Sequence, residues 1–312
     1  MRNLLMKVLR LLFVVVAVSF ITTICIRLIP GDPSQLTCAG ADKAKCDVVR
    51  KDMGLDRPVV AQFGTWAKDF ATGDLGKYYR RPEIVSDRVK AGLPVSLSLI
   101  LYTQVVGLLI AIPLGVMTAY RAGGVFDGGA NLFSFLALSI PGFIIGYVLK
   151  KFLALDLDLL PESGWVPITE NVGQHFRHAI LPVATLVLSQ IAVYFRLLRS
   201  DMIGTLQEDF ITMARAKGLR PRRILFRHAL RPSSLTLLTV AGLNIGTLIS
   251  SAVLVERIFG ATGVGYTLVE AIFSREYVAV QSLVAVVCII FVVINFAVDF
   301  LYTVIDPRIR HA

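Results

Sequence analysis

Residues 95–120 read VSLSLILYTQVVGLLIAIPLGVMTAY, and no charged side chain interrupts them. A helix needs about 20 mostly apolar residues to cross roughly 30 Å of bilayer hydrocarbon, and this stretch is longer than that. Lipid offers the backbone no hydrogen-bond partners, and apolar runs of this length do not suit barrel strands. Comparable runs occupy about 8–29, 131–154, 178–198, 233–255 and 279–304. The sequence therefore predicts an all-α membrane protein with six transmembrane helices.

The composition agrees with this class. Hydrophobic residues make up 55% of the 312 residues and the mean hydropathy is +0.69, whereas charged residues are only 17%. Arg2, Lys7 and Arg10 precede or open the first apolar run, as in a signal peptide. Because the run is long and no small-residue cleavage site follows it, we expect a retained helix over residues 1–29.

The distribution of charge indicates the orientation. The net charge of +10 could suit nucleic acid, but the basic residues gather in one loop: between Arg196 and Arg231 there are nine Lys or Arg and three Asp or Glu. Short loops of this kind stay in the cytoplasm. Six spans then place both termini there, with residues 305–312 as a cytoplasmic tail, and no nucleic-acid partner is expected.

Residues 30–93 are expected to be extracytoplasmic. Their length and their mixed charge, eleven basic and nine acidic residues, favour a small folded insertion rather than a plain connector. Residues 42–53, ending at Gly54, and residues 58–70 could each form an amphipathic helix, whereas 73–82 has the composition of a loop.

The four cysteines divide by position. Cys25 and Cys288 lie in apolar runs and are interpreted as packing residues. Cys38 and Cys46 share the extracytoplasmic segment, where oxidising conditions allow a disulfide. The alternative is two free thiols, because the sequence does not fix the separation of their Cα atoms.

The stretch EDFITMARAKGLRPRRILFRHALRPSSL, residues 208–235, lies in the basic inner loop. Its pattern predicts a helix, a break at Gly218 and a second amphipathic turn over residues 224–230. Glu208 and Asp209 stand where acids complement the positive end of a helix, and Gly218 allows the left-handed conformation that ends one. We expect Leu225 and Phe226 on the apolar side of the second turn.

A short helix parallel to the membrane suits insertion into the groove of a soluble partner. The small residues Ala214, Ala216 and Gly218 would permit close approach, and basic residues would steer it. The alternative, that the basic residues only fix the topology, does not explain the alternation of small and basic residues before the glycine.

At this point the sequence resembles a known family. ARAKGL (residues 214–219) and RHALR (residues 227–231) resemble the conserved cytoplasmic loop of ABC-importer permeases. The family's loop begins with Glu-Ala-Ala, and Thr212, Met213 and Ala214 stand at those positions here, a departure common in peptide and nickel importers. Further stretches are similar to the B-type permease of dipeptide and oligopeptide importers: PGDP (30–33), MGLDRPVVAQF (53–63), GDLG (73–76), LISSAVLVERIFGATGVG (248–265) and DPRIR (306–310).

The resemblance implies a type I ABC-importer permease core over residues 94–304, in a bacterial inner membrane, with a coupling loop at about 205–232. It implies a second homologous permease, two ATPase subunits that bind ATP and Mg, an extracytoplasmic peptide-binding protein and surrounding lipid. This chain itself would be a transporter subunit rather than an enzyme and would hold no cofactor. The residues implied in docking are Glu208, Asp209, Thr212, Met213, Ala214, Arg215, Ala216, Lys217, Gly218 and Leu219, with Arg227 and His228 in the second turn.

Two alternatives remain open. The same subfamily includes permeases for nickel and for glutathione, which the permease sequence separates poorly from peptide permeases. A different class, an ATP-independent channel or membrane scaffold, is disfavoured by the loop around Gly218.

Other motifs do not indicate catalysis or metal binding. GATGVGYT (residues 260–267) has Tyr266 where a phosphate-binding loop needs lysine, so it is interpreted as an outer turn. His175 and His178 are one turn apart, and we expect both to be solvated surface residues. No catalytic residue and no metal site is predicted.

Overall fold

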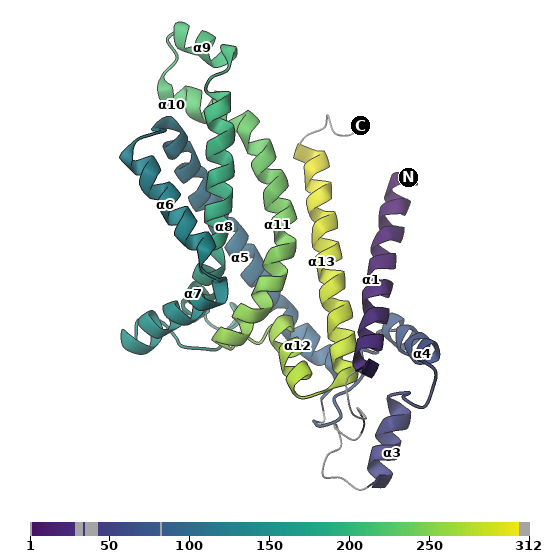
Figure 1. Ribbon diagram of the computed structural model, residues 1–312. Helices are drawn as coiled ribbons and strands as arrows, with labels where there is room; N and C mark the ends of the chain where they lie inside the picture. The colour runs from purple at the N-terminus through teal and green to yellow at the C-terminus, as the bar shows by residue number, and fades with distance from the viewer. Residues whose placement is uncertain (1, 29–33, 35–42, 82, 306–312) are drawn as a thin grey trace. The chain divides into compact units, whose positions relative to one another are not determined.

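The structure is a computed structural model that describes residues 2–28, 34, 43–81 and 83–305 (Figure 1). Within them the regular structure is helical apart from one isolated bridge between Lys77 and Ile84, which confirms the all-α class. The helices are α1 (Arg2–Leu28), α3 (Lys43–Asp52), α4 (Val59–Ala71), α5 (Val85–Tyr120), α6 (Val125–Ser139), α7 (Gly142–Leu149), α8 (Val172–Thr205), α9 (Asp209–Ala216), α10 (Pro221–Arg223), α11 (Leu230–Phe259), α12 (Val264–Phe273) and α13 (Tyr277–Ile305), with π-helical stretches η1 (Lys150–Asp156) and η2 (Ile224–Ala229).

Four helical segments of the described chain are long and apolar enough to cross a membrane: α5, α8, residues 221–259 and Tyr277–Val298. In α1 the described apolar stretch, Leu12–Leu28, is shorter. The structure thus confirms a membrane protein with several spans, while the count of six stays a prediction. The division at residues 93 and 94 also stays a prediction; α5 runs through it without interruption.

The expected helix over 131–154 is not continuous. α6 and the segment Gly142–Asp156 meet at an angle of 99° and count as one broken span or a re-entrant loop. Pro141 explains the break, because proline disfavours the helical conformation in the residue before it. Ile140 accordingly has an extended backbone, with φ −99° and ψ 124°.

The described residues form two compact units. One contains the chain up to Ser96 together with Gly260–Ile294, and we call it the insertion unit. The other contains Leu97–Phe259 and the residues from Asn295 onward, and we call it the bundle unit.

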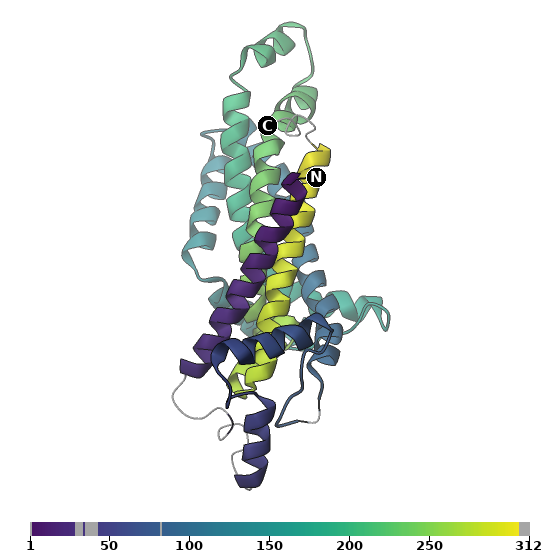
Figure 2. The same ribbon diagram turned by 90° about the vertical axis from the view of Figure 1, so that its right-hand side faces the viewer.

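In the insertion unit, α4 lies across α13 (Figure 2). The Trp66 indole nitrogen donates a hydrogen bond to the Ser282 hydroxyl at 3.0 Å, and Phe63 packs edge-on against Phe20 of α1 at 5.2 Å between ring centroids. Val85, Val264 and Leu283 are buried in one hydrophobic cluster, which forms the rest of the core of this unit. The two amphipathic helices expected before and after Gly54 are confirmed as α3 and α4.

α12 was not anticipated. The GATGVGYT stretch, interpreted as an outer turn, ends as a turn at Gly263, and its last residues begin α12. α5 begins at Val85, before the apolar run, and continues into it without interruption.

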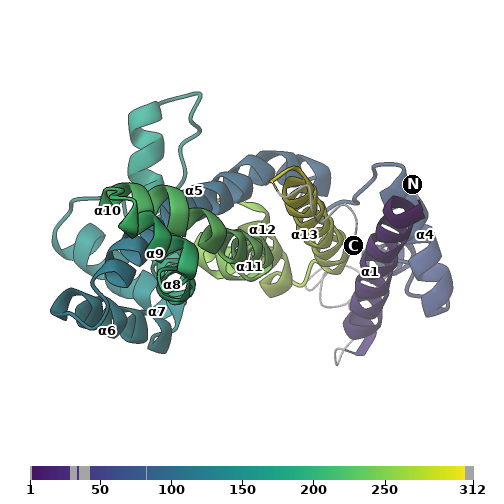
Figure 3. The same cartoon turned by 90° about the horizontal axis from the view of Figure 1, so that it is seen from above.

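The bundle unit is built around α8. Tyr194, Phe195, Leu198 and Met202 of this helix are completely buried, and α8 packs against α6, α7 and α11 (Figures 1 and 3). On α5, a Cβ added to Gly115 would lie 3.0–3.1 Å from Leu198 side-chain atoms. The glycine therefore allows α5 to approach α8 closely.

A buried ion pair joins the start of α6 to α8. Arg199 Nε and Nη2 donate to the two carboxylate oxygens of Asp127 at 2.5 and 2.6 Å. The Asp127 side chain is 5% exposed, and it also accepts from the Gly123 amide at 2.9 Å and the Asn131 side chain at 3.0 Å. Every acceptor position of this carboxylate is thus used, which is what a buried charge requires.

His175 is buried rather than solvated, contrary to the expectation. Its ring nitrogens hydrogen-bond the Tyr102 hydroxyl at 2.9 Å and the Val166 carbonyl at 2.7 Å. His178 does not join it in a metal site: its Nδ1 bonds Gln174 in its own helix. The described residues contain no cluster of three metal-ligating side chains.

Replacing Arg199 with methionine should destabilise the protein by about 3 kcal/mol, because the Asp127 carboxylate would stay buried without its cation. Thermal unfolding of the purified protein in detergent measures this. Arg196→Met is the matched control on the same helix. Arg196 is exposed and lies 5.1 Å over the Phe135 ring, so its loss should cost about 0.5–1 kcal/mol. Equal shifts for the two variants would contradict a dominant Asp127–Arg199 pair.

Cys46 lies in α3 and is not among the free thiols of the described residues, which are Cys25 and Cys288. Cys38 lies outside those residues, so the bridge stays a prediction. Mass spectrometry of unreduced, alkylated protein should find the peptides of Cys38 and Cys46 joined and both thiols unmodified. Alkylation of both would exclude the bridge.

Candidate functional site

The segment between α8 and α11 folds as a helix, a glycine break and a second helix (Figures 1 and 2). At its base the Thr205 hydroxyl of α8 and the Ser233 hydroxyl of α11 are 3.0 Å apart and hydrogen-bonded. α9 begins at Asp209, directly after Glu208, so both acids lie at the positive end of the helix as expected.

The break at Gly218 has the geometry of a helix C-cap. Gly218 has φ +73°, its amide donates to the Arg215 carbonyl at 2.9 Å, and the Leu219 amide donates to the Ala214 carbonyl at 3.2 Å. These two bonds are those of a Schellman motif with glycine in the left-handed position. The predicted stop is therefore confirmed, with its cause.

The inner side of α9 anchors it to the bundle unit. Ile211 is completely buried and Ala214 is 6% exposed, and both belong to the apolar cluster that contains Met202 and Leu198. Ala214 was expected among the small residues that admit a partner. The structure corrects this, because Ala214 faces its own chain.

The outer side of α9 is apolar and exposed to solvent. Phe210 is 46% exposed and Met213 is 58% exposed, and Lys217 is exposed four residues further on. Spacings of three and four residues place these side chains on one face of the helix. Large apolar side chains exposed together are typical of an interaction site.

The second half of the loop comprises α10 and η2. Ile224 and Leu225 are buried, whereas Phe226 is 49% exposed, so its expected place on the apolar side is wrong. Phe226 instead lines a hollow of about 450 Å³ together with Arg220, Arg222 and Arg223.

Most of the remaining residues implied in docking are exposed. The exposed ones are Glu208, Asp209, Thr212, Met213, Arg215, Ala216, Lys217, Gly218 and Arg227, and the half-buried ones are Leu219 and His228. Most of these residues are therefore exposed on the loop between α8 and α11. Sequence reasoning missed Ile211, the buried anchor, although its spacing of three residues from Ala214 was a signal that could have found it.

Comparisons with known proteins cover nearly the whole chain. Residues 111–311 match the binding-protein-dependent transport system inner membrane component, and residues 1–100 match the N-terminal family of the same membrane components. A probable peptide ABC transporter permease protein, y4tP of Sinorhizobium fredii, is 35% identical over 287 residues, 92% of each chain.

Two further relatives agree. The oligopeptide transport system permease protein AppB of Bacillus subtilis is 33% identical over 302 residues, 96% of each chain. The di/tripeptide transport system permease protein DppB of Pseudomonas aeruginosa is 35% identical over 320 residues, 94% of each chain.

Among solved structures, an inward-facing form of the MetNI methionine ABC transporter contains a chain that is similar with a TM-score of 0.56 and 17% identity, covering 70% of this chain and 96% of that one. This likeness supports the fold alone. From the family matches and the relatives, the chain belongs to the family of inner-membrane permease components of binding-protein-dependent transport systems.

Proposed function

We propose that this chain is the permease subunit of an ABC importer that carries dipeptides or oligopeptides across a bacterial inner membrane. The names of the relatives support the substrate class. The exposed apolar face of α9 supports the dependence of this permease on separate ATPase subunits. The path would form between this chain and a second homologous permease, and an extracytoplasmic binding protein would deliver the peptide.

Two ATPase subunits would bind ATP and Mg, and the residues 205–232 would dock on one of them. Phe210 and Met213 are the apolar anchors of this contact, and the arginines around Phe226 add positive charge beside it. A helix anchored by Ile211 moves with the bundle unit. Closure of the ATPases would therefore displace the spans by rigid-body motion and alternate the access to the path.

The basic loop also supports the orientation, with both termini in the cytoplasm. The residues 30–93 would then lie outside the membrane. A cysteine placed at either terminus should react with an impermeant reagent only after the membrane is opened.

A cysteine at Met213 should crosslink to the ATPase when both are expressed together, because this side chain is 58% exposed on the outer face of α9. The reagent is a short thiol-to-amine crosslinker, and the product is identified by mass spectrometry. Ile211→Cys is the matched control on the opposite, buried face of the same helix and should not react. A Met213→Cys variant that never reaches the ATPase would overturn the docking role.

Gly218→Val should reduce ATP-dependent peptide uptake at least tenfold without preventing membrane insertion. A left-handed conformation costs a residue with a side chain about 1–2 kcal/mol, and valine would shift the end of α9. An added Cβ meets no atom of this chain within 4 Å, so the fold has room for it. Gly218→Asn, which tolerates the conformation better, should retain more uptake.

Uptake of a radiolabelled dipeptide into proteoliposomes with all partner proteins measures this, and membrane extraction measures insertion. Normal transport by Gly218→Val would refute the coupling role. Uptake that persists without ATP would instead favour a channel.

A further inference from the structure

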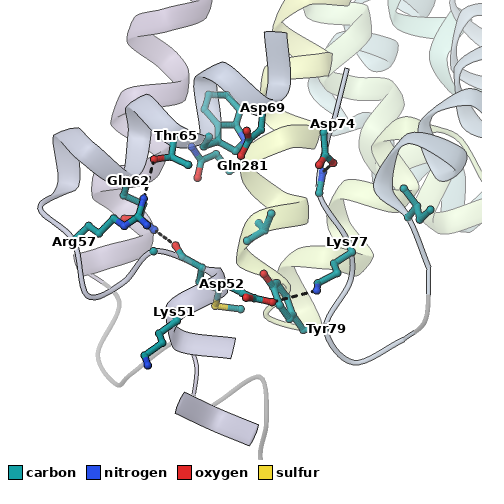
Figure 4. A pocket seen from close by; sticks show the side chains of 16 residues that line it. Lys51, Asp52, Arg57, Gln62, Thr65, Asp69, Asp74, Lys77, Tyr79 and Gln281 are labelled. Carbon is teal, nitrogen blue, oxygen red and sulfur yellow. Dashed lines mark hydrogen bonds and ion pairs between the residues drawn. The ribbon is translucent and has the colours of Figure 1, made fainter. Parts of the chain in front are cut away.

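Charged side chains gather where the proposed orientation places water. In the insertion unit, α3, α4 and the loop of residues 74–79 contribute most of the lining of a polar pocket of about 530 Å³ (Figure 4). There Lys77 pairs with Asp52 at 3.2 Å, and both side chains are solvated. Exposed polar side chains on a helix that crosses the membrane need another explanation, because hydrocarbon does not solvate them.

One face of α11 is rich in hydroxyl groups. Consecutive members are three or four residues apart, with Ser251 one turn after Thr247, so they form one continuous face of the helix. We call these seven exposed residues the hydroxyl face: Thr236, Thr239, Leu243, Thr247, Ser250, Ser251 and Leu254.

The exposed face of α5 has a different composition. Between residues 97 and 117 its exposed side chains are all apolar: Leu97, Leu101, Val105, Leu109, Ile110, Pro113 and Met117. Such a surface matches the acyl chains of lipid, which are as apolar as leucine. Both helices belong to the bundle unit and both are long and apolar enough to cross a membrane. The contrast therefore indicates that the hydroxyl face of α11 meets something other than lipid.

The hydroxyl hydrogens alone do not exclude lipid. Thr239 donates to the Leu235 carbonyl at 3.0 Å, and Thr247 donates to the Asn244 carbonyl at 2.8 Å. Such bonds within one helix allow serine and threonine to occur in membrane spans. Each hydroxyl oxygen still has an unused acceptor position, and a neighbouring pair of amides shows what that position meets.

The amide pair joins α8 to α11. Asn244 Nδ2 donates to Gln190 Oε1 at a long 3.5 Å, and Gln190 is only 8% exposed. Within the described residues neither side chain makes another hydrogen bond, so Gln190 Nε2 and Asn244 Oδ1 are unpaired. Gln190 Nε2 is not one of the fully inaccessible donors without a partner, so solvent can reach it.

This pair lies beside the hydroxyl face, because Asn244 is one turn from Thr247 on the same helix. An amide donor and an amide acceptor without partners are costly in hydrocarbon. Water satisfies both of them, together with the free acceptor positions of the hydroxyl oxygens. Two independent features of the bundle unit thus indicate water at one side of α11.

We propose that the hydroxyl face of α11 and the Gln190–Asn244 pair border the water-filled translocation path, and that the exposed face of α5 borders lipid. This inference rests on the proposed function and adds the surface of this chain that a permeant molecule contacts. The neutral hydroxyl and amide groups offer hydrogen bonds without a fixed charge, so they suit a path that solutes of either charge can leave.

The test compares two leucines that differ in their face. Leu243 of α11 is 69% exposed and Leu109 of α5 is 67% exposed, and each lies near the middle of its apolar run. Leu243→Cys and Leu109→Cys are each treated with a charged methanethiosulfonate reagent, in the transporter complex purified with its partner subunits in lipid nanodiscs. Because the thiolate is the reactive form, Leu243→Cys in water should react at least tenfold faster than Leu109→Cys in lipid.

Mass spectrometry of the labelled peptide gives each rate, so the natural cysteines do not enter the comparison. Thr247→Cys and Ser250→Cys should react as fast as Leu243→Cys, and Leu101→Cys should react as slowly as Leu109→Cys. Equal rates at Leu243→Cys and Leu109→Cys, whether both fast or both slow, would overturn the proposal. Slow labelling of all three α11 variants would show that lipid or a dry subunit contact covers the face.

Gln190→Leu tests the amide pair. It removes the free donor at similar side-chain size, so it should keep the melting temperature of the complex but lower dipeptide uptake into proteoliposomes at least threefold. Ser189→Ala is the matched control, because the Ser189 hydroxyl donates to the Leu186 carbonyl of its own helix at 3.2 Å, and its uptake should not change. Unchanged uptake in Gln190→Leu would remove the amide pair from the path.

The labelling rates require neither ATP nor peptide, so they are independent of the proposed substrate. A complex that labels as expected but transports no peptide would keep the water-lined face and refute the substrate alone. A complex that transports peptide while Leu243→Cys stays as unreactive as Leu109→Cys would keep the proposed function and refute this inference.

Discussion

The burial of α8 is the constraint on which the bundle unit depends. Tyr194, Phe195, Leu198 and Met202 have no solvent-exposed surface. The helices α6, α7 and α11 pack against α8. Between membrane helices, water provides no hydrophobic driving force, so close packing and polar contacts must supply the association. Gly115 supplies the first and the Asp127–Arg199 pair supplies the second. Because the loop that contains α9 continues directly from α8, the packing at Gly115 and the Asp127–Arg199 pair also fix the position of this loop.

Much of this architecture could be predicted from the sequence. Long apolar runs indicate helices by length alone, and the run at 95–120 lies within the single helix α5. The end of α9 could also be predicted from the sequence, because few residues other than glycine adopt the φ of Gly218. The helices around Gly54 followed from amphipathic spacing and from the glycine between them.

Other features depend on contacts that local patterns do not encode. Asp127 and Arg199 are 72 positions apart, and nothing near either residue signals the other. The polar loop beside His175 favours a surface position for it, but Tyr102 and Trp165 contact its ring and it is buried. Ala214 was assigned to the wrong face of α9 because both faces of that helix carry apolar residues. In each case tertiary packing decides between interpretations that the sequence alone allows.

The corner at Pro141 has a consequence for the surroundings of the bundle unit. A helix that stops at Ser139 leaves its last carbonyl groups without donors from a following turn, and among the described residues the Ser139 hydroxyl donates only to the Phe135 carbonyl, at 2.7 Å. Acyl chains cannot hydrate such groups. The break between α6 and α7 must therefore border either water or another polypeptide. This part of the bundle is thus not in contact with the hydrocarbon core of the bilayer.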